Sequence, residues 1–174
     1  MRKNVIAVRD DARAIIGGFV GMVAMGIFAY LIAPAAGLPK LDFGSWIGTL
    51  FLPAGTTAMV IGLVIALLAG LIWALLYERV VRAVVAGGDW LGGTIWGLIA
   101  WLLAGVILGV SGTFHPRIAA GQIANPGFFG LALGGWMMPV SIFLAFLVYG
   151  VVLGLVYELF TERQIGRAAG PATA

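Results

Sequence analysis

Long apolar runs separated by short polar segments dominate the pattern along the chain. Four stretches, at about 15–32, 59–77, 91–110 and 139–157, contain no Asp, Glu, Lys or Arg. A membrane-spanning helix needs about 20 mostly apolar residues, whereas a half-buried strand would show a period of two. The pattern therefore predicts an all-α integral membrane protein, in which four membrane-spanning helices form a single membrane domain, 1–174.

Composition supports this fold class and excludes several functions. Apolar residues make up 62% of the chain and charged residues 10%, against about 25% charged in a soluble domain. The absence of Cys excludes a disulfide scaffold and a thiolate metal site. The net charge of +3 is small and scattered, so we expect no nucleic-acid partner and no soluble substrate.

The first apolar stretch has features of both a signal peptide and a membrane span. Ala33-Pro34-Ala35 is a weak cleavage-like sequence, but the apolar run is longer than a typical signal core, and Asp10 and Asp11 precede it. We expect a retained first span.

Basic residues predict the orientation of the bundle. The connections on one side carry eight Lys and Arg residues, and those on the other side carry only Lys40 and Arg117. The eight are Arg2, Lys3, Arg9, Arg13, Arg79, Arg82, Arg163 and Arg167. Positive residues concentrate on the cytoplasmic side. We therefore expect a multi-pass protein of the bacterial cytoplasmic (inner) membrane with both termini in the cytoplasm.

The two connections on the opposite side are unusually apolar. Asp42 is a candidate N-cap for a helix over residues 43–51, which we expect to lie flat on the outer leaflet or on a partner. The segment from Thr113 to Gly130 is rich in Pro and Gly and predicts a shaped loop. The candidate partner-docking residues in both segments are Phe43, Trp46, Ile47, Leu50, Phe51, Phe114, Phe128 and Phe129.

An internal repeat relates the second and fourth stretches. A shift of 80 positions aligns Tyr77-Glu78 with Tyr157-Glu158, and a weaker shift of 76 aligns the first stretch with the third. The repeat indicates a duplicated two-helix hairpin. A transport path at a repeat interface usually carries ionisable residues near the midplane, and the apolar stretches contain none. We therefore favour a pseudo-symmetric bundle.

Small residues recur every four positions and predict how the helices pack. Such rows let helix backbones approach closely in lipid, so we expect a tight bundle with little internal cavity. The alternative is that a flat glycine face receives a pigment, a quinone or a lipid tail. The candidate helix-packing residues are Gly17, Gly21, Gly62, Ala66, Gly70, Ala74, Gly93, Gly97, Gly105, Gly109, Gly150 and Gly154.

Candidate chemistry is sparse. His115, the single histidine, is a candidate ligand for haem or pigment, although a hydrogen-bonded loop residue is the simpler interpretation. We expect Asp89 at the start of the third span. We expect residues 164–174 to form a flexible tail. No catalytic motif or metal-ligand cluster appears, so we expect the chain not to be an enzyme and to have no cofactor of its own.

The order of three motifs resembles a family of small, uncharacterised bacterial four-span membrane proteins. The motifs are Gly37-Leu38-Pro39-Lys40-Leu41-Asp42, Asn125-Pro126-Gly127-Phe128-Phe129 and Gly150-Val151-Val152-Leu153-Gly154-Leu155-Val156-Tyr157. The resemblance implies the four-span fold over nearly the whole chain, and it carries no established activity or functional residues.

These features predict a non-catalytic accessory subunit of a larger membrane complex. A respiratory or photosynthetic electron-transfer complex is the expected host, with other integral subunits and membrane lipids as partners. The chain would stabilise assembly and shield lipid or cofactor, in contact with a lipid, quinone, haem or pigment of a partner. The alternatives are a small homo-oligomeric transporter or channel, and a haem- or pigment-binding subunit that uses His115.

Overall fold

The computed structural model describes residues 2–84 and 90–168, and within these ranges it is helical and has no strand. Four long helices are α1 (Arg2–Ile27), α4 (Thr56–Val84), α5 (Trp90–Gly109) and α8 (Met137–Ala168). Segments long and apolar enough to cross a membrane are Asp11–Ala35, Thr56–Val81, Trp90–Gly109 and Met137–Phe160. The predicted four-span helical fold is confirmed.

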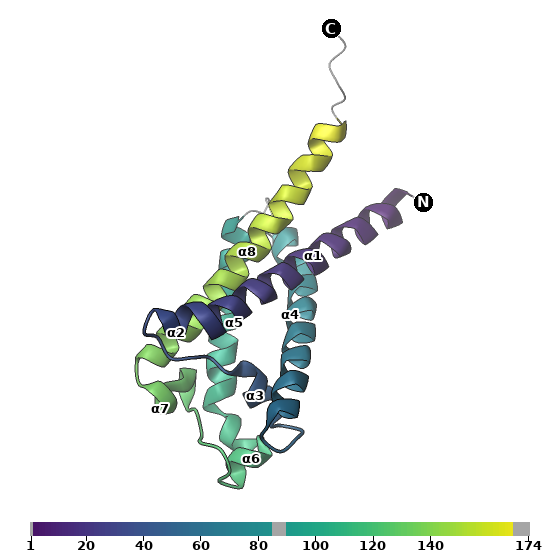
Figure 1. The fold of residues 1–174 in the computed structure, drawn as a ribbon. Helices are drawn as coiled ribbons and strands as arrows, with labels where there is room; N and C mark the ends of the chain where they lie inside the picture. Colours follow the sequence, from purple (N-terminus) through teal and green to yellow (C-terminus); the bar gives the residue numbers. More distant parts are fainter. Residues whose placement is uncertain (1, 85–89, 169–174) are drawn as a thin grey trace.

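Shorter elements gather at one end of the bundle. They are η1 (Phe28–Ile32), α2 (Ala33–Ala35), α3 (Phe43–Gly48), η2 (Ser111–Thr113), α6 (Pro116–Ala119), η3 (Phe128–Gly130) and α7 (Leu131–Gly134). Figure 1 shows the start of α1 and the end of α8 beyond the opposite end, as an even number of crossings requires. The predicted shaped loop contains a single turn of α-helix, α6.

Helix α8 is the centre of the bundle and packs on α5 and α1. On α5, a Cβ added to Gly97 would lie 2.5 Å from the carbonyl oxygen of Phe146, and one added to Gly93 would lie 2.7 Å from Cα of Gly154. On α1, Gly21 lies against the ring of Tyr149. These helices approach so closely because the contacting positions have no side chain.

Helix α3 does not lie flat at the end of the bundle. Gly44 packs against Met59 and Leu63 of α4, and Gly48 packs against Ala58, so α3 runs antiparallel along the first turns of α4. The predicted helix after Asp42 is confirmed over Phe43–Gly48, and it packs on α4 of the same chain. Glycines on one face of α3 admit the α4 backbone, which a surface helix would not need.

The first span contains a five-residue π-helical segment, η1, before it ends at Ala35. The wider turn leaves the carbonyl of Ala29 to accept a hydrogen bond from the amide of Leu41, at 3.4 Å. π-Helical turns are rare and are frequent at functional sites. In this chain the segment places Tyr30 beside α3, where its ring contributes to the cavity described below.

Helix α8 continues past the membrane-spanning part to Ala168. Residues 164–168, expected in a flexible tail, are therefore helical, whereas 169–174 lie outside the described residues. Asp89, expected at the start of the third span, also lies outside them.

Candidate functional site

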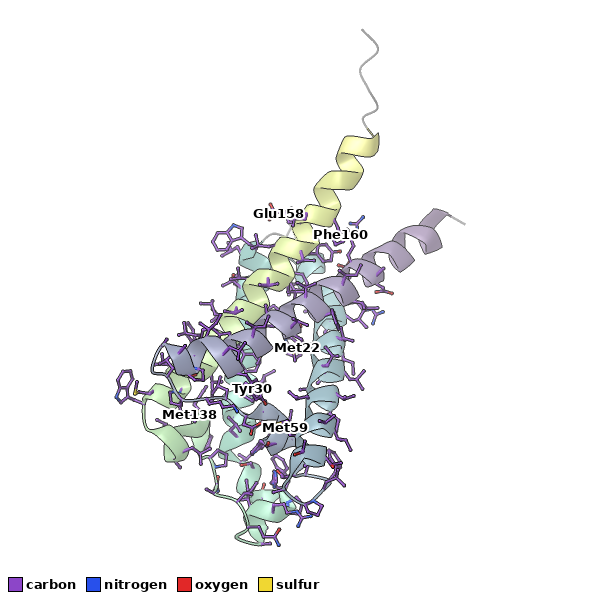
Figure 2. The ribbon with its side chains drawn as sticks, in the orientation of Figure 1. Met22, Tyr30, Met59, Met138, Glu158 and Phe160 are labelled. Carbon is purple, nitrogen blue, oxygen red and sulfur yellow. The ribbon has the colours of Figure 1, made fainter. Side chains whose placement is uncertain are left out.

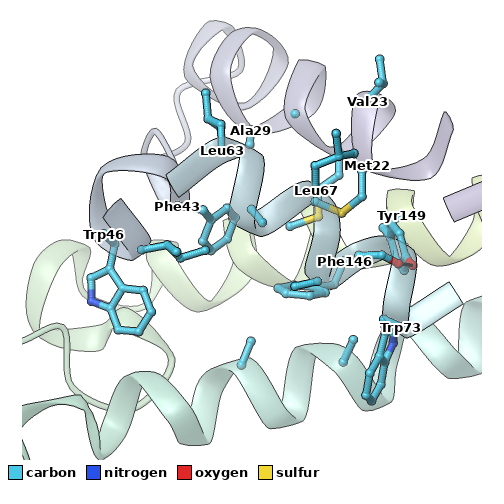
Figure 3. A pocket seen from close by; sticks show the side chains of 18 of the residues that line it. Met22, Val23, Ala29, Phe43, Trp46, Leu63, Leu67, Trp73, Phe146 and Tyr149 are labelled. Carbon is cyan, nitrogen blue, oxygen red and sulfur yellow. Dashed lines mark hydrogen bonds between the residues drawn. The ribbon is translucent and has the colours of Figure 1, made fainter. Parts of the chain in front are cut away.

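The most conspicuous feature of the bundle is a cavity of about 610 Å³ between α1, α3, α4, α5 and α8. Figure 3 shows Phe43 and Trp46 of α3 at one end of this space and Trp73 of α4 at the other. Phe146 and Tyr149 of α8 line the wall between these ends. The volume lies within the range of about 300–1,000 Å³ that is typical of small-molecule sites.

Aromatic side chains close the deep end of the cavity. Trp73 stacks on Trp96 of α5 with ring centroids 4.4 Å apart, and the indole nitrogen of Trp96 donates to the carbonyl oxygen of Trp73 at 2.9 Å. The Tyr149 hydroxyl donates to the carbonyl oxygen of Gly70 at 2.8 Å. Both bonds attach α4 to its neighbours near Gly70 and Trp73, so α4 is fixed at this level.

The α3 end of the cavity carries polar groups at its rim. The Tyr30 hydroxyl donates to Asp42 at 2.9 Å and accepts from the amide of Gly44 at 3.3 Å. The ammonium group of Lys40 lies 5.0 Å from the centroid of the Tyr30 ring. Along the first span, Tyr30 of η1 lies nearer α3, and Met22 of α1 lies nearer the opposite end of the bundle (Figure 2).

Asp42 caps α3, as the sequence predicts, by accepting a hydrogen bond from the amide of Ser45 at 3.0 Å. Partial burial raises the pKa of Asp42. Hydrogen bonds from Ser45 and Tyr30 and the charge of Lys40 lower this pKa. Together they outweigh the effect of burial, so the pKa of Asp42 lies below its usual value. The carboxylate is therefore ionised at neutral pH.

The wall of the cavity is almost wholly hydrocarbon. The hydroxyls of Tyr30 and Tyr149 are engaged in the bonds above. The indole nitrogens of Trp46 and Trp73 are covered by protein atoms and have no hydrogen-bond partner in the described part of the chain. Both of these unpartnered indole N–H groups therefore belong to lining residues, but neither nitrogen is exposed on the wall.

The cavity meets the lipid-facing surface of the bundle. Several of its lining side chains are also among the exposed large apolar residues: Phe19, Val23, Leu63, Leu103 and Ile107. Helices α4 and α5 contact each other only sparsely, in contrast to the extensive α5–α8 contact. Exposed lining residues on both α4 and α5 place part of the cavity wall at the surface of the bundle.

A protein-family model, described as "Family of unknown function (DUF6789)", matches residues 8–167. The chain belongs to this family. The match confirms the resemblance to an uncharacterised membrane protein family. No curated protein and no solved structure matches the chain.

In this DUF6789 member, the predicted small-residue rows meet several kinds of neighbour. Gly93, Gly97, Gly150 and Gly154 bring α5 onto α8, Gly17 and Gly21 bring α1 onto α8, and Gly62 receives the backbone of α3. Gly70 lies against Met22, and Ala74 lies against Gly18 of α1. Ala66 instead lines the cavity. The expected absence of a cavity is therefore wrong on the α4 side of the bundle.

The remaining small positions on α5 receive rings rather than a helix. Phe129 fills the space beside Gly105 and packs on Trp101 with centroids 4.8 Å apart, and Phe128 covers Gly109. Phe129 adopts a φ of 53°, which costs a non-glycine residue roughly 1–2 kcal/mol. Packing of its ring on α5 holds this conformation in place.

The candidate docking residues divide into two groups. Phe43, Trp46 and Ile47 turn inward and line the cavity. Phe51, Phe114 and Phe128 are exposed, whereas Leu50 and Phe129 are partly buried. The three candidate docking residues that lie within α3 itself therefore all line the cavity.

His115 is fully buried. Its Nε2 lies 3.1 Å from the carbonyl oxygen of Trp46 and 3.4 Å from Oγ1 of Thr49, and its ring lies 5.4 Å from that of Trp46. The imidazole thus links the connection between α5 and α8 to α3. In this position Nε2 lies within hydrogen-bond distance of both groups, and Nδ1 is covered by protein and has no hydrogen-bond partner in the described part of the chain. No metal-ligating cluster of three His, Cys, Asp or Glu occurs among the described residues.

The repeat-related Tyr-Glu pairs meet at the end that holds the termini. The rings of Tyr77 and Tyr157 pack edge to face with centroids 5.9 Å apart, and the Tyr157 hydroxyl donates to Glu78. The two halves are nevertheless not equivalent. The repeat relates α1 to α5 and α4 to α8. The close contact between α1 and α8 therefore corresponds to the sparse contact between α5 and α4. The cavity lies beside α4 and α5, where the close contact that the repeat predicts is missing.

Gly44 and Gly48 are structural residues that the sequence interpretation missed. Their four-residue spacing in α3 is the same signal that marks the packing faces of the long helices. The signal was available in the sequence, and it indicates a helix packed on another helix.

Proposed function

We propose that this protein is a non-catalytic subunit of a larger membrane complex, and that it holds an apolar ligand of that complex between its helices. The ligand is a lipid or the hydrocarbon tail of a membrane-soluble cofactor. The observation that carries the proposal is the cavity of about 610 Å³, lined by hydrocarbon and in contact with the lipid-facing surface.

The chemistry of the membrane-spanning segments supports a binding role. Their central parts carry no Asp, Glu, His, Lys or Arg, and the described residues contain no metal-ligating cluster. General acid–base catalysis needs a titratable group within reach of its substrate. A hydrocarbon wall also gives no favourable path to an ion or a polar solute, so the geometry favours binding over transport.

The accessory role, the electron-transfer host and the inner-membrane location with cytoplasmic termini are parts of the same proposal. The charge asymmetry of the connections supports the orientation. Exposed aromatic residues on the connections, Phe51, Phe114 and Phe128, supply a surface for a second membrane subunit.

The test is extraction from native membranes in mild detergent, followed by native gel separation and mass spectrometry of proteins and apolar small molecules in the same band. We expect co-migration at fixed stoichiometry with other integral subunits, together with a retained apolar molecule. Deleting the chain should loosen the complex without abolishing its chemistry. Migration of the chain alone, with no apolar molecule bound, would contradict the proposal.

A further inference from the structure

We propose that the cavity takes one acyl chain of a phospholipid, and that the phosphate of this lipid lies at the rim formed by Lys40, Tyr30 and Asp42. This inference rests on the proposed binding function and identifies its ligand. It selects a bilayer phospholipid over a cofactor with a polar ring, and it assigns the lipid to the leaflet on the side of α3.

The length of the cavity is similar to the length of acyl chain that one leaflet holds. Its lining on α4 runs from Leu63 to Trp73, which is roughly 15 Å at about 1.5 Å per residue. The hydrocarbon core of a bilayer is about 30 Å thick, so one leaflet supplies about 15 Å. A chain that enters beside α3 would therefore end at the Trp73–Trp96 stack.

The wall discriminates against a polar ring. A quinone or pigment head would bring carbonyl oxygens into a space where the unpartnered donors of the described lining, the indole N–H groups of Trp46 and Trp73, are covered by protein atoms. Each buried unsatisfied polar group costs about 1–3 kcal/mol. An acyl chain has no such groups, so it fills this wall without that cost.

The rim supplies a place for the head. Lys40 is exposed, and its ammonium lies over Tyr30, whose ring lines the cavity. Asp42 offsets part of the Lys40 charge, because the two groups interact electrostatically. The phosphate contact therefore makes the smaller contribution to lipid binding, and burial of the acyl chain in the cavity makes the larger one.

The test uses phosphatidylcholine vesicles that contain a trace of phosphatidylcholine with a photoreactive diazirine in the middle of one chain. Protein reconstituted in these vesicles is irradiated, and adducts are mapped by peptide mass spectrometry. Tyr149 is 2% exposed and lines the cavity, so bulk lipid does not reach it. We expect adducts on the two cavity-lining residues of this part of α8, Phe146 and Tyr149, as well as on exposed positions such as Leu102.

Two neighbouring substitutions form a matched pair. Leu67 lines the cavity, whereas Leu68 is exposed on α4 and does not line it. Leu67→Trp should abolish the adducts on Phe146 and Tyr149, and Leu68→Trp should leave them unchanged. Ala104→Leu, a smaller filling change on α5, should lower the same adducts. Retained labelling at Leu102 shows that each variant is inserted and folded.

Lys40→Gln tests the head. With the phospholipid probe, adducts on Phe146 and Tyr149 should fall about two- to fivefold, the effect of one exposed ion pair. With an uncharged diacylglycerol probe of the same chain, they should not change. An equal effect on both probes would overturn the assignment of the phosphate.

Two results separate this inference from the proposed function. If a diazirine-tagged isoprenoid quinone labels Phe146 and Tyr149 and the phospholipid does not, the phospholipid assignment is wrong while the binding function stands. If neither probe labels these two residues although Leu102 is labelled, both are wrong.

Discussion

Helix α5 packs against two other long helices, α8 and α4, and it meets them in opposite ways. Towards α8 it presents Gly93 and Gly97, and the two backbones touch. Towards α4 it presents Trp96, which stacks on Trp73 and donates to its carbonyl oxygen. Interaxial distances of about 8–10 Å depend on the side chains at the contact. Glycines therefore close one contact, and an indole pair holds the other apart.

The difference shows how a membrane bundle keeps an interior space. Lipid competes with protein for apolar surface, so association depends on close packing and hydrogen bonds. In this chain the glycine contacts hold α1, α5 and α8 together. Helix α4 is attached at the Trp73–Trp96 level and by the packing of α3, and between these points the cavity remains.

The largest expected effect is on the glycine contact. A Cβ added to Gly150 would lie 2.9 Å from Cα of Gly97, and neither backbone has room to move. Gly150→Leu should lower the free energy of unfolding by more than about 3 kcal/mol. The measurement is reversible unfolding in mixed micelles. Gly26→Ala is the control, because nothing lies within 4 Å of its added Cβ, and it should be neutral or stabilising. Equal losses for both variants would contradict the comparison.

A second change tests the indole pair as a spacer. Trp96→Ala should cost about 3 kcal/mol as a large-to-small replacement. It should also let α4 move towards α5. The distance between α4 and α5 can be measured with spin labels on Leu68→Cys and Leu102→Cys. Because the chain has no Cys, no other position is labelled. A shorter distance in Trp96→Ala than in the parent supports the spacer role, and an unchanged distance argues against it.

A smaller effect is expected at His115. His115→Ala removes the hydrogen bond to the carbonyl of Trp46 and leaves a small void, at a cost of about 2 kcal/mol. The purified protein should show no visible absorbance band before or after the change. A band that disappears in His115→Ala would restore the haem or pigment interpretation.

The smallest effect concerns the cap of α3. Asp42→Ala should cost about 1 kcal/mol, because the Ser45 amide loses its acceptor. The folded pKa of Asp42 lies below its unfolded value of about 3.9, so its contribution is present at neutral pH and is lost as the pH falls through the folded pKa. Stability measured from pH 7 downward should converge for the parent and the variant below that pKa. A difference between them that persists at the acid end would show that the carboxylate charge is not responsible.

The sequence predicts the parts of this fold that depend on local chemistry. Apolar length identifies the four spans, and Asp42 caps α3 because its carboxylate reaches the Ser45 amide three residues on. The four-residue spacing predicts that Gly93 and Gly97 lie on a packing face of α5, but it does not predict which element packs there. Gly62 meets α3 and Gly105 meets Phe129, and both pairings depend on the path of the loops.

The cavity could not be predicted from the residues that line it. Leu67 and Leu68 are chemically identical neighbours, and only the position of α4 decides which one faces the interior. The aromatic face of α3 reads equally well as a lipid face or an interior one. The π-helical turn at Phe28–Ile32, which places Tyr30 at the rim, has no sequence signature in this chain.

The most direct test of the account is a high-resolution density map of the protein in phospholipid nanodiscs. We predict that α4 stands apart from α5 on the α3 side of the Trp73–Trp96 stack, with elongated density running from Tyr30 to that stack. Helices α4 and α5 packed together along their whole length, with no density between them, would contradict it.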